Sequence, residues 1–97
     1  MDRAAILDRI ERGRTDAIFE LLAAPDWREA LVSGRTSALQ WLVYYGDVTA
    51  LKAVLLHGGD LATLDLGAEL GNAAFFGHWK MCDFLIRHGA DPRHADA

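Results

Sequence analysis

The sequence predicts an all-α protein, a solenoid of three stacked helix-turn-helix repeats. The first observation is internal repetition, because residues 46–60 align without a gap on residues 77–91, at a spacing of 31 positions. The second is a series of short segments with apolar residues at helical spacing, separated by Gly or Pro. No stretch alternates apolar and polar residues for long enough to predict a strand. Helices of about nine residues are marginal alone, so each pair must gain stability by stacking on the next.

Length and composition predict one globular domain that spans residues 1–97. Hydrophobic residues make up 52% of the chain and charged residues 25%, which is typical of a folded protein rather than a disordered one. The net charge of −4 argues against a nucleic-acid partner, because phosphate binding needs clustered Lys and Arg.

The sequence carries no signal for secretion or for membrane insertion. Its first residues are charged and hold no apolar signal-peptide core, and no apolar run approaches the roughly 18 residues of a membrane span. The single cysteine, Cys82, excludes an intrachain disulfide and suits a reducing compartment. We therefore expect a cytoplasmic protein with no membrane partner.

The first third of the chain predicts two helices followed by a long connection. One helix covers residues 2–12, begins at Asp2 as its N-cap and presents an apolar face. That face is formed by Ala5, Ile6 and Ile10. A second helix starts near residue 15 and ends before Pro25, which has no backbone N–H to continue it. We interpret residues 26–35 as a connection that packs Trp27 and Leu31 on the helices, with a short helical turn as the alternative.

The rest of the chain predicts two further helix pairs. Their helices cover residues 37–45, 48–57, 68–76 and 79–88. The first of these is apolar on nearly every side, which is typical of an inner helix between neighbours. Ser37 or Thr36 can cap it, whereas Ala68 offers no cap to the third pair, which follows an extended link over residues 61–67. The predicted repeats cover approximately residues 2–36, 37–67 and 68–97, and the first has a polar capping face.

The repeated segment resembles the second half of an ankyrin repeat. The family signature, G-H-x-x-x-V-x-x-L-L-x-x-G-A-D, is matched closely by residues 77–91, nearly as well by residues 46–60, and loosely by residues 13–27. The first-helix signature, T-P-L-H-x-A, departs more, since Gln40 and Gly71 replace its His. The resemblance implies ankyrin-type helix pairs in a right-handed stack. It also implies recognition of other proteins through the concave face and loop tips, without enzymatic activity.

Two arrangements of polar residues suggest chemistry, and both have a simpler structural explanation. Cys82 and His78 are four residues apart on one predicted helix, as a nucleophile and its base could be. However, Cys82 occupies an apolar core position and no third group orients the pair. His88, Asp91 and His94 are separated by helix breakers and lack a zinc-binding spacing. We therefore expect no catalytic residue, no metal and no cofactor.

Two aromatic pairs, Tyr44-Tyr45 and Phe75-Phe76, precede turn glycines at positions 31 residues apart. Adjacent residues on a helix cannot face the same neighbour, so at least one ring of each pair should lean toward the concave face. The rings either fill space beside small residues or form an exposed strip that binds a partner. The partner-binding residues that we predict are Tyr44, Tyr45, Asp47, Phe75, Phe76, His78 and Trp79.

The predicted function is the binding of another protein by a preorganised surface. The alternative is structural: an end-cap, or the N-terminal portion of a longer ankyrin array. In that case the chain would associate with a second copy or with further repeats through an exposed last repeat. This alternative rests on the last predicted helix, where Trp79, Phe84 and Ile86 point in different directions and should leave apolar surface bare.

Overall fold

The computed structural model describes residues 3–91, and all regular structure in that range is helical. In chain order the elements are α1 (Arg3–Glu11), the 3-10 turn η1 (Thr15–Ala17), α2 (Ile18–Leu22), α3 (Trp27–Leu31), α4 (Ala38–Tyr44), α5 (Val48–Leu56), α6 (Leu66–Phe75) and α7 (Trp79–Arg87). The predicted all-α class is confirmed, while the predicted N-cap Asp2 lies outside the described residues. Within residues 3–91, no helix is both long enough and apolar enough to span a membrane.

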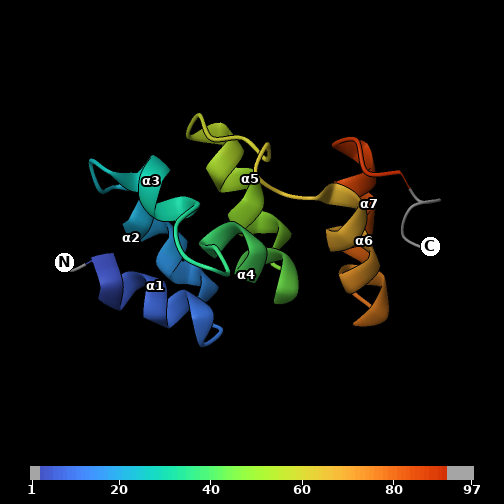
Figure 1. The fold of residues 1–97 in the computed structure, drawn as a ribbon, viewed down its shortest axis with the longest axis horizontal. Coiled ribbons are helices and arrows are strands. Elements are labelled where there is room, and N and C mark those ends of the chain that lie inside the picture. The colour runs from blue at the N-terminus through green and yellow to red at the C-terminus, as the bar shows by residue number, and fades with distance from the viewer. Residues whose placement is uncertain (1–2, 92–97) are drawn as a thin grey trace.

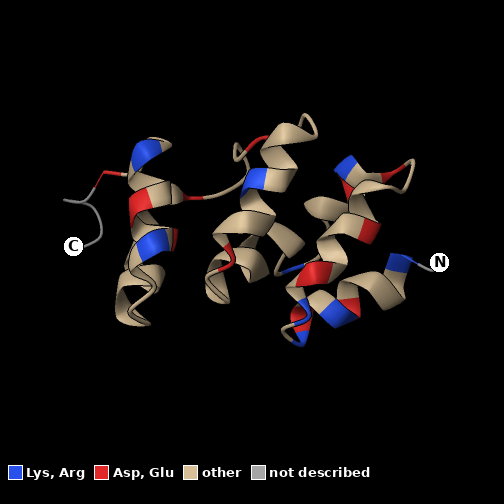
Figure 2. Cartoon of the chain, turned by 180° about the vertical axis from the view of Figure 1, so that it is seen from behind, with Lys and Arg blue, Asp and Glu red and all other residues tan. Residues whose placement is uncertain are grey.

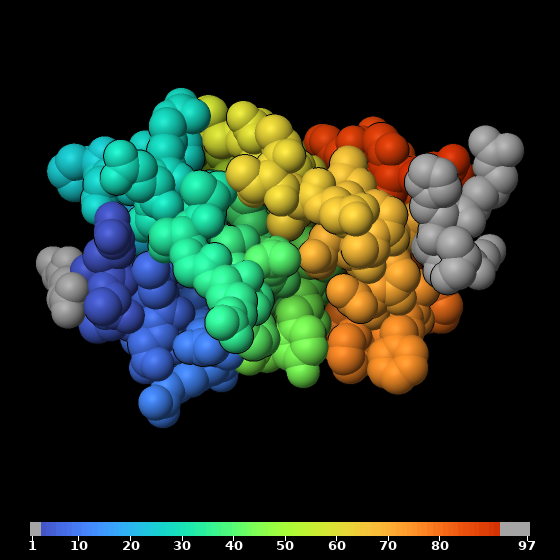
Figure 3. All heavy atoms as spheres, viewed as in Figure 1, coloured from blue at the N-terminus to red at the C-terminus, as the bar shows by residue number. Residues whose placement is uncertain are grey.

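The helices stack as three layers along one axis (Figure 1). α1 packs on α4 and α4 on α6, while α2 packs on α5 and α5 on α7. The first helices of the layers therefore form one row and the second helices another, in a body of 41 × 25 × 22 Å. Figure 3 shows that the segments leading into α4 and α6 cross one face of the molecule over the seams between layers. This stacking is compatible with the predicted solenoid, and the boundaries of the three repeats stay a prediction.

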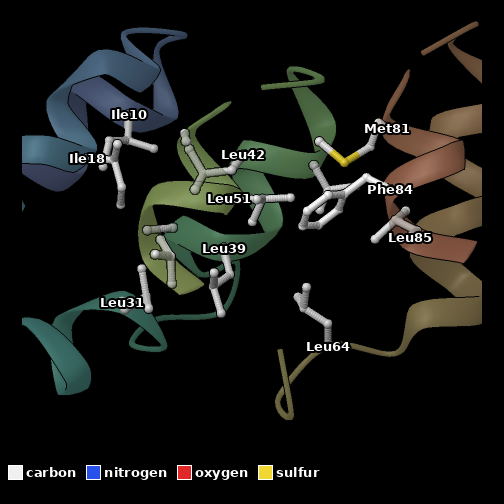
Figure 4. Close-up of a cluster of buried hydrophobic side chains, with 14 of the residues drawn as sticks. Ile10, Ile18, Leu31, Leu39, Leu42, Leu51, Leu64, Met81, Phe84 and Leu85 are labelled. Carbon is white, nitrogen blue, oxygen red and sulfur yellow. The ribbon is translucent and has the colours of Figure 1, made fainter. Parts of the chain in front are cut away.

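A single apolar core runs through all three layers (Figure 4). Ile10 and Ile18 enter it from the first layer, Leu42 and Leu51 from the middle layer and Leu85 from the last, and each is 0% exposed. The middle layer buries side chains toward both of its neighbours, which explains why its first helix is apolar on nearly every side. None of these short helices buries such side chains alone, so the layers stabilise one another.

Two segments differ from the predicted bounds. Residues 27–31 form α3, so the helical alternative holds for the connection after Pro25, and Leu31 is buried as expected. α6 begins at Leu66 instead of residue 68, because a carboxylate oxygen of Asp65 accepts a hydrogen bond from the backbone N–H of Ala68 at 3.2 Å. With this aspartate as its cap the helix begins two residues earlier than predicted, and the extended link before it is correspondingly shorter.

The ends and faces of the other helices follow from their sequences with one exception. α4 begins at a capping box: Gln40 N–H donates to the Ser37 hydroxyl at 3.3 Å, and Ser37 N–H donates to the Gln40 side chain at 2.7 Å. On α1, Ile6 and Ile10 are buried but Ala5 is exposed, so its assignment to the apolar face was wrong. Its side chain is rotated by about 100° from that of Ile6, which turns it away from the core.

Candidate functional site

A chain of ring contacts, which we call the aromatic edge, lies at the turn ends of α4 and α6. It consists of Trp41, Tyr44, Tyr45, Phe75, Phe76 and His78. Tyr44 and Phe76 join the two layers, with ring centroids 5.1 Å apart. Each also contacts its chain neighbour, at 5.0 Å for Tyr44 with Tyr45 and at 5.2 Å for Phe76 with Phe75. These rings meet edge to face, an arrangement that aromatic pairs favour.

The aromatic edge divides into outward and inward rings. The outward rings are Phe75, Phe76 and Tyr44, which are 84%, 47% and 44% exposed. The inward rings, Tyr45 and His78, are half-buried. Three contiguous exposed rings that span two layers form the kind of apolar patch that usually marks an interaction site.

The inward rings connect each layer to the layer before it. The Tyr45 hydroxyl donates a hydrogen bond to the backbone carbonyl of Glu11. Similarly, His78 Nε2 lies 3.0 Å from the carbonyl of Tyr44, to which it donates, because a carbonyl only accepts. In both cases the acceptor stands two residues before a turn glycine of the preceding layer. These two residues therefore have an inter-layer role in addition to any contact with a partner.

The turn glycines make room for these rings. A Cβ on Gly46 would lie 2.9 Å from the His78 ring, and a Cβ on Gly13 would lie 3.5 Å from the Tyr45 ring. Gly46 also has a φ of +71°, a left-handed conformation that favours glycine. Gly77 has nearly the same conformation, with a φ of +74°, yet no described atom lies within 4 Å of its Cβ position. The turn of the third layer is therefore open where the first two turns are covered.

Two of the predicted partner-binding residues lie outside the aromatic edge. Asp47 accepts a hydrogen bond from the backbone N–H of Ala50 at 2.9 Å and so caps α5. Its carboxylate therefore already serves as the N-cap of a helix. Trp79 is 72% exposed, but it lines a cleft between α5 and α7. The structure thus brings together Tyr44, Tyr45, Phe75, Phe76 and His78, and it separates the other two.

A groove of about 360 Å³ between α4 and α6 adjoins the aromatic edge at Trp41 and Tyr44. Sequence reasoning did not find it. It also contains Glu69, which is 8% exposed. Burial raises the pKa of this carboxyl, the charge of Asp65 raises it further, and a hydrogen bond from Gln40 opposes both. Glu69 stands beside Leu70 and one turn before Ala73, so it falls on the buried face of α6. This spacing is the signal that was missed.

The cleft between α5 and α7 has a volume of about 580 Å³. Its walls include Val48, Lys52, Trp79, Lys80, Phe84 and Arg87. Of the three apolar residues expected to leave surface bare, Trp79 and Ile86 are exposed, at 72% and 43%. Phe84 is only 5% exposed, so that expectation was wrong for this side chain. Its ring packs against His88 at a centroid distance of 4.4 Å, and its inner side reaches the core.

Cys82 and His78 do not form a reactive pair. The thiol is 8% exposed, and burial raises its pKa, which disfavours the reactive thiolate. The His78 ring is instead directed to the carbonyl of Tyr44. Across residues 3–91 there is no group of three or more His, Cys, Asp and Glu side chains that could hold a metal ion. His94, one of the residues weighed as a ligand, lies outside the described residues.

Among known protein families, a match is found over the last layer of the chain. The sequence model of the ankyrin repeat matches residues 72–97, a segment that begins inside α6 and includes all of α7. No curated protein and no solved structure matches the chain. The matched segment contains Phe75, Phe76 and His78 of the aromatic edge.

Proposed function

We propose that this chain, which is an ankyrin repeat protein, binds another protein through the outward rings Tyr44, Phe75 and Phe76. Ankyrin repeats generally mediate protein–protein interactions. The observation that carries the proposal is the exposure of three contiguous rings across two layers. Buried aromatic anchors supply much of the binding energy at protein interfaces, and an unbound monomer gains nothing from exposing them.

The inward rings make this surface rigid before a partner arrives. Tyr45 and His78 fix the turn ends of α4 and α6 relative to the preceding layers through hydrogen bonds to backbone carbonyls. The outward rings are in turn held by edge-to-face contacts. Binding therefore orders few groups that were free before, which lowers its entropic cost.

The groove between α4 and α6 extends this surface along the first helices of the second and third layers. It offers the partly buried Trp41 as an apolar wall and Asn72 as an exposed hydrogen-bonding side chain. A partner side chain that entered this groove would contact Tyr44 at its rim. We thus propose an interface with aromatic anchors at the turn tips and polar recognition in the adjoining groove.

Quantitative affinity capture with variants of the outward rings tests this function. Phe75→Ser with Phe76→Ser removes two anchors from exposed positions, so the fold should remain intact. The matched control is Leu56→Ser, which removes a side chain that is 89% exposed at the end of α5 and away from the aromatic edge. We expect at least one protein to be captured by the wild type and by the control but lost from the Phe75/Phe76 variant. If the captured set is the same for all three proteins, the aromatic edge is not the binding surface.

A second candidate function is association with another copy of this chain through the last layer, and the open turn favours it. The first two turns are each covered by a ring from the following layer, whereas Gly77 has none among the described residues. Ile86 on α7 is 43% exposed and adds apolar surface. Light scattering over a range of concentrations separates this candidate from the first. A mass that rises with concentration and falls to the monomer in Ile86→Asp supports it, and a constant monomer mass refutes it.

A further inference from the structure

The cleft between α5 and α7 gathers positively charged side chains in a part of the chain that is otherwise acidic. Between residues 36 and 91 the sequence holds six Asp or Glu residues and only three Lys or Arg residues, namely Lys52, Lys80 and Arg87. All three cations line this one cleft, and Asp83 is the only one of the six carboxylates that does so. The blue bands on α5 and α7 lie on the same side in Figure 2. A cluster of cations on an acidic chain attracts an anionic ligand by local rather than overall charge.

The two lysines of the cleft are available for such a ligand. Arg87 pairs with Asp83 at 2.8 Å, in an exposed i,i+4 ion pair of the kind that contributes little to stability. Lys52 and Lys80, which are the only lysines of the chain, form no ion pair with the described residues, and both are exposed. Two ammonium groups on neighbouring helices thus face one cleft without a carboxylate of their own.

The rest of the cleft lining is apolar except for His88. Val48 from α5 and Trp79 and Phe84 from α7 line it beside the lysines. Trp79 is 72% exposed, so its ring offers a broad surface for an apolar or aromatic group. A volume of about 580 Å³ falls within the usual range of ligand sites, which is roughly 300–1,000 Å³. The site therefore matches a ligand that carries negative charge and an apolar group together.

Among anionic ligands, the side chains favour carboxylates over phosphates. Bidentate recognition of phosphate relies on arginine, and the single guanidinium of the cleft is held by Asp83. That carboxylate also repels a doubly charged phosphate more than it repels a single carboxylate. A nucleic acid would extend beyond the cleft onto a surface where carboxylates outnumber cations.

We propose that this cleft binds an acidic peptide segment of a partner protein, with carboxylates on Lys52 and Lys80 and an apolar side chain against Trp79 and Phe84. This binding site is separate from the aromatic edge and adds a second recognition element with its own chemistry. Because the two surfaces share no residue, each can be tested while the other is intact. A partner that contacts both surfaces would gain affinity by multivalency.

The test is a titration of the isotope-labelled chain with a synthetic peptide, followed by NMR. The probe is a peptide of about ten residues with Glu flanking a central Leu, and its control is the same peptide with Gln for Glu. We expect the indole N–H of Trp79 to shift on addition of the acidic peptide, while that of Trp41, in the aromatic edge, stays in place. The Gln peptide should bind about tenfold more weakly, and the binding of the acidic peptide should weaken as salt is raised.

Charge-reversal variants locate the site. Lys52→Glu with Lys80→Glu should weaken binding of the acidic peptide by about tenfold or more. Arg12→Glu with Arg35→Glu changes the net charge by the same amount outside the cleft and should have little effect, as should Phe75→Ser with Phe76→Ser. Any of three outcomes refutes the proposal: equal weakening by both charge-reversal pairs, equal binding of the Glu and Gln peptides, or a phosphate or oligonucleotide that displaces the acidic peptide from the cleft. Loss of capture by the Phe75/Phe76 variant with peptide binding unchanged would show that the two surfaces act independently.

Discussion

Individual side chains in this protein are divided between holding the layers together and facing solvent, often at adjacent positions. Tyr44 is 44% exposed, whereas Tyr45 is half-buried and donates its hydroxyl proton to the preceding layer. In the last layer, His78 makes the equivalent connection, and Phe75 and Phe76 remain outward. The two pairs thus differ: Tyr44-Tyr45 is divided between solvent and the preceding layer, whereas both rings of Phe75-Phe76 are exposed.

The contact between His78 and Gly46 can be isolated by a comparison of two glycines. Gly46 and Gly77 have nearly equal φ values of +71° and +74°, so an alanine at either position carries the same backbone strain. Only the alanine at Gly46 would also meet a ring, at 2.9 Å. We expect Gly46→Ala to lower the free energy of unfolding by about 1 kcal/mol more than Gly77→Ala does, because the ring must shift.

Urea unfolding of both glycine variants measures this difference. Repeating the comparison in a His78→Ala background removes the ring, and the two alanines should then cost the same. Equal losses of unfolding free energy in the wild-type background would show that the His78 ring moves aside without destabilising the fold.

Glu69 gives a second prediction at the residue scale, through the pH dependence of stability. Its pKa in the folded protein lies above the ordinary value, mainly because it is buried. The folded state therefore holds the proton more tightly than the unfolded state. The resulting stabilisation is full below the ordinary pKa and is lost as the pH rises through the raised pKa. Glu69→Gln, which keeps the shape without the charge, should thus be more stable than the wild type near neutral pH.

Chemical unfolding of Glu69→Gln and of the wild type, measured at about pH 7 and about pH 4, checks this expectation. The difference in the free energy of unfolding between the two proteins should be smaller at the acidic pH than at neutral pH. At the acidic pH the wild-type carboxyl is mostly protonated and therefore uncharged, like the Gln side chain. Other carboxyls affect both proteins alike and cancel in the difference. A difference that is independent of pH would mean that Glu69 is ionised equally easily in the folded and unfolded states.

At the scale of elements, side-chain caps mark the starts of α4, α5 and α6. Ser37 and Gln40 begin α4, Asp47 begins α5 and Asp65 begins α6, each by accepting a backbone N–H of the first turn. The cap at Asp65 lets α6 begin two residues before its predicted start, and Glu69 lies on the buried side of this helix.

The cap of α5 gives a prediction that separates structure from binding. Asp47→Ala should lower the free energy of unfolding by about 1 kcal/mol, because the N–H of Ala50 loses its acceptor. Asp47→Ser can still cap the helix and should restore most of the loss. Thermal or urea unfolding measures both variants. An Asp47→Ala protein with unchanged stability but impaired partner capture would instead indicate that Asp47 contacts the partner.

At the scale of the whole molecule, the repetition at 31 positions was enough to predict helix pairs stacked as a solenoid. The cleft between α5 and α7 could not be predicted from this repetition. At a spacing of 31 positions Lys52 aligns with Asp83 and Lys80 with Thr49, so the two lysines are not at equivalent positions. These lysines line one cleft because α5 and α7 pack side by side in successive layers. Likewise, the bonds of Tyr45 and His78 join residues 34 positions apart. No periodicity within one repeat reveals contacts of that kind, which depend on how the layers are placed in space.

The middle layer should control the stability of the whole stack. Leu51 is 0% exposed in the core that all three layers share, and Leu51→Ala should cost about 2–5 kcal/mol by leaving a cavity. Leu56→Ala on the same helix, where the side chain is 89% exposed, should cost little. Urea unfolding followed separately by far-UV circular dichroism and tryptophan fluorescence checks both variants. A Leu51→Ala protein that unfolds as the wild type does would mean that the layers are not coupled through this side chain.

Site-specific photocrosslinking tests whether the outward rings of the aromatic edge bind another protein. A benzophenone side chain is introduced at Phe75, which is 84% exposed, and at Leu56, which is 89% exposed and serves as the control. Irradiation in the native cell, followed by analysis of covalent adducts, should yield a defined adduct with another protein from position 75 and none from position 56. Absence of an adduct at position 75, or the same adducts from both positions, would show that the outward rings do not bind a partner protein.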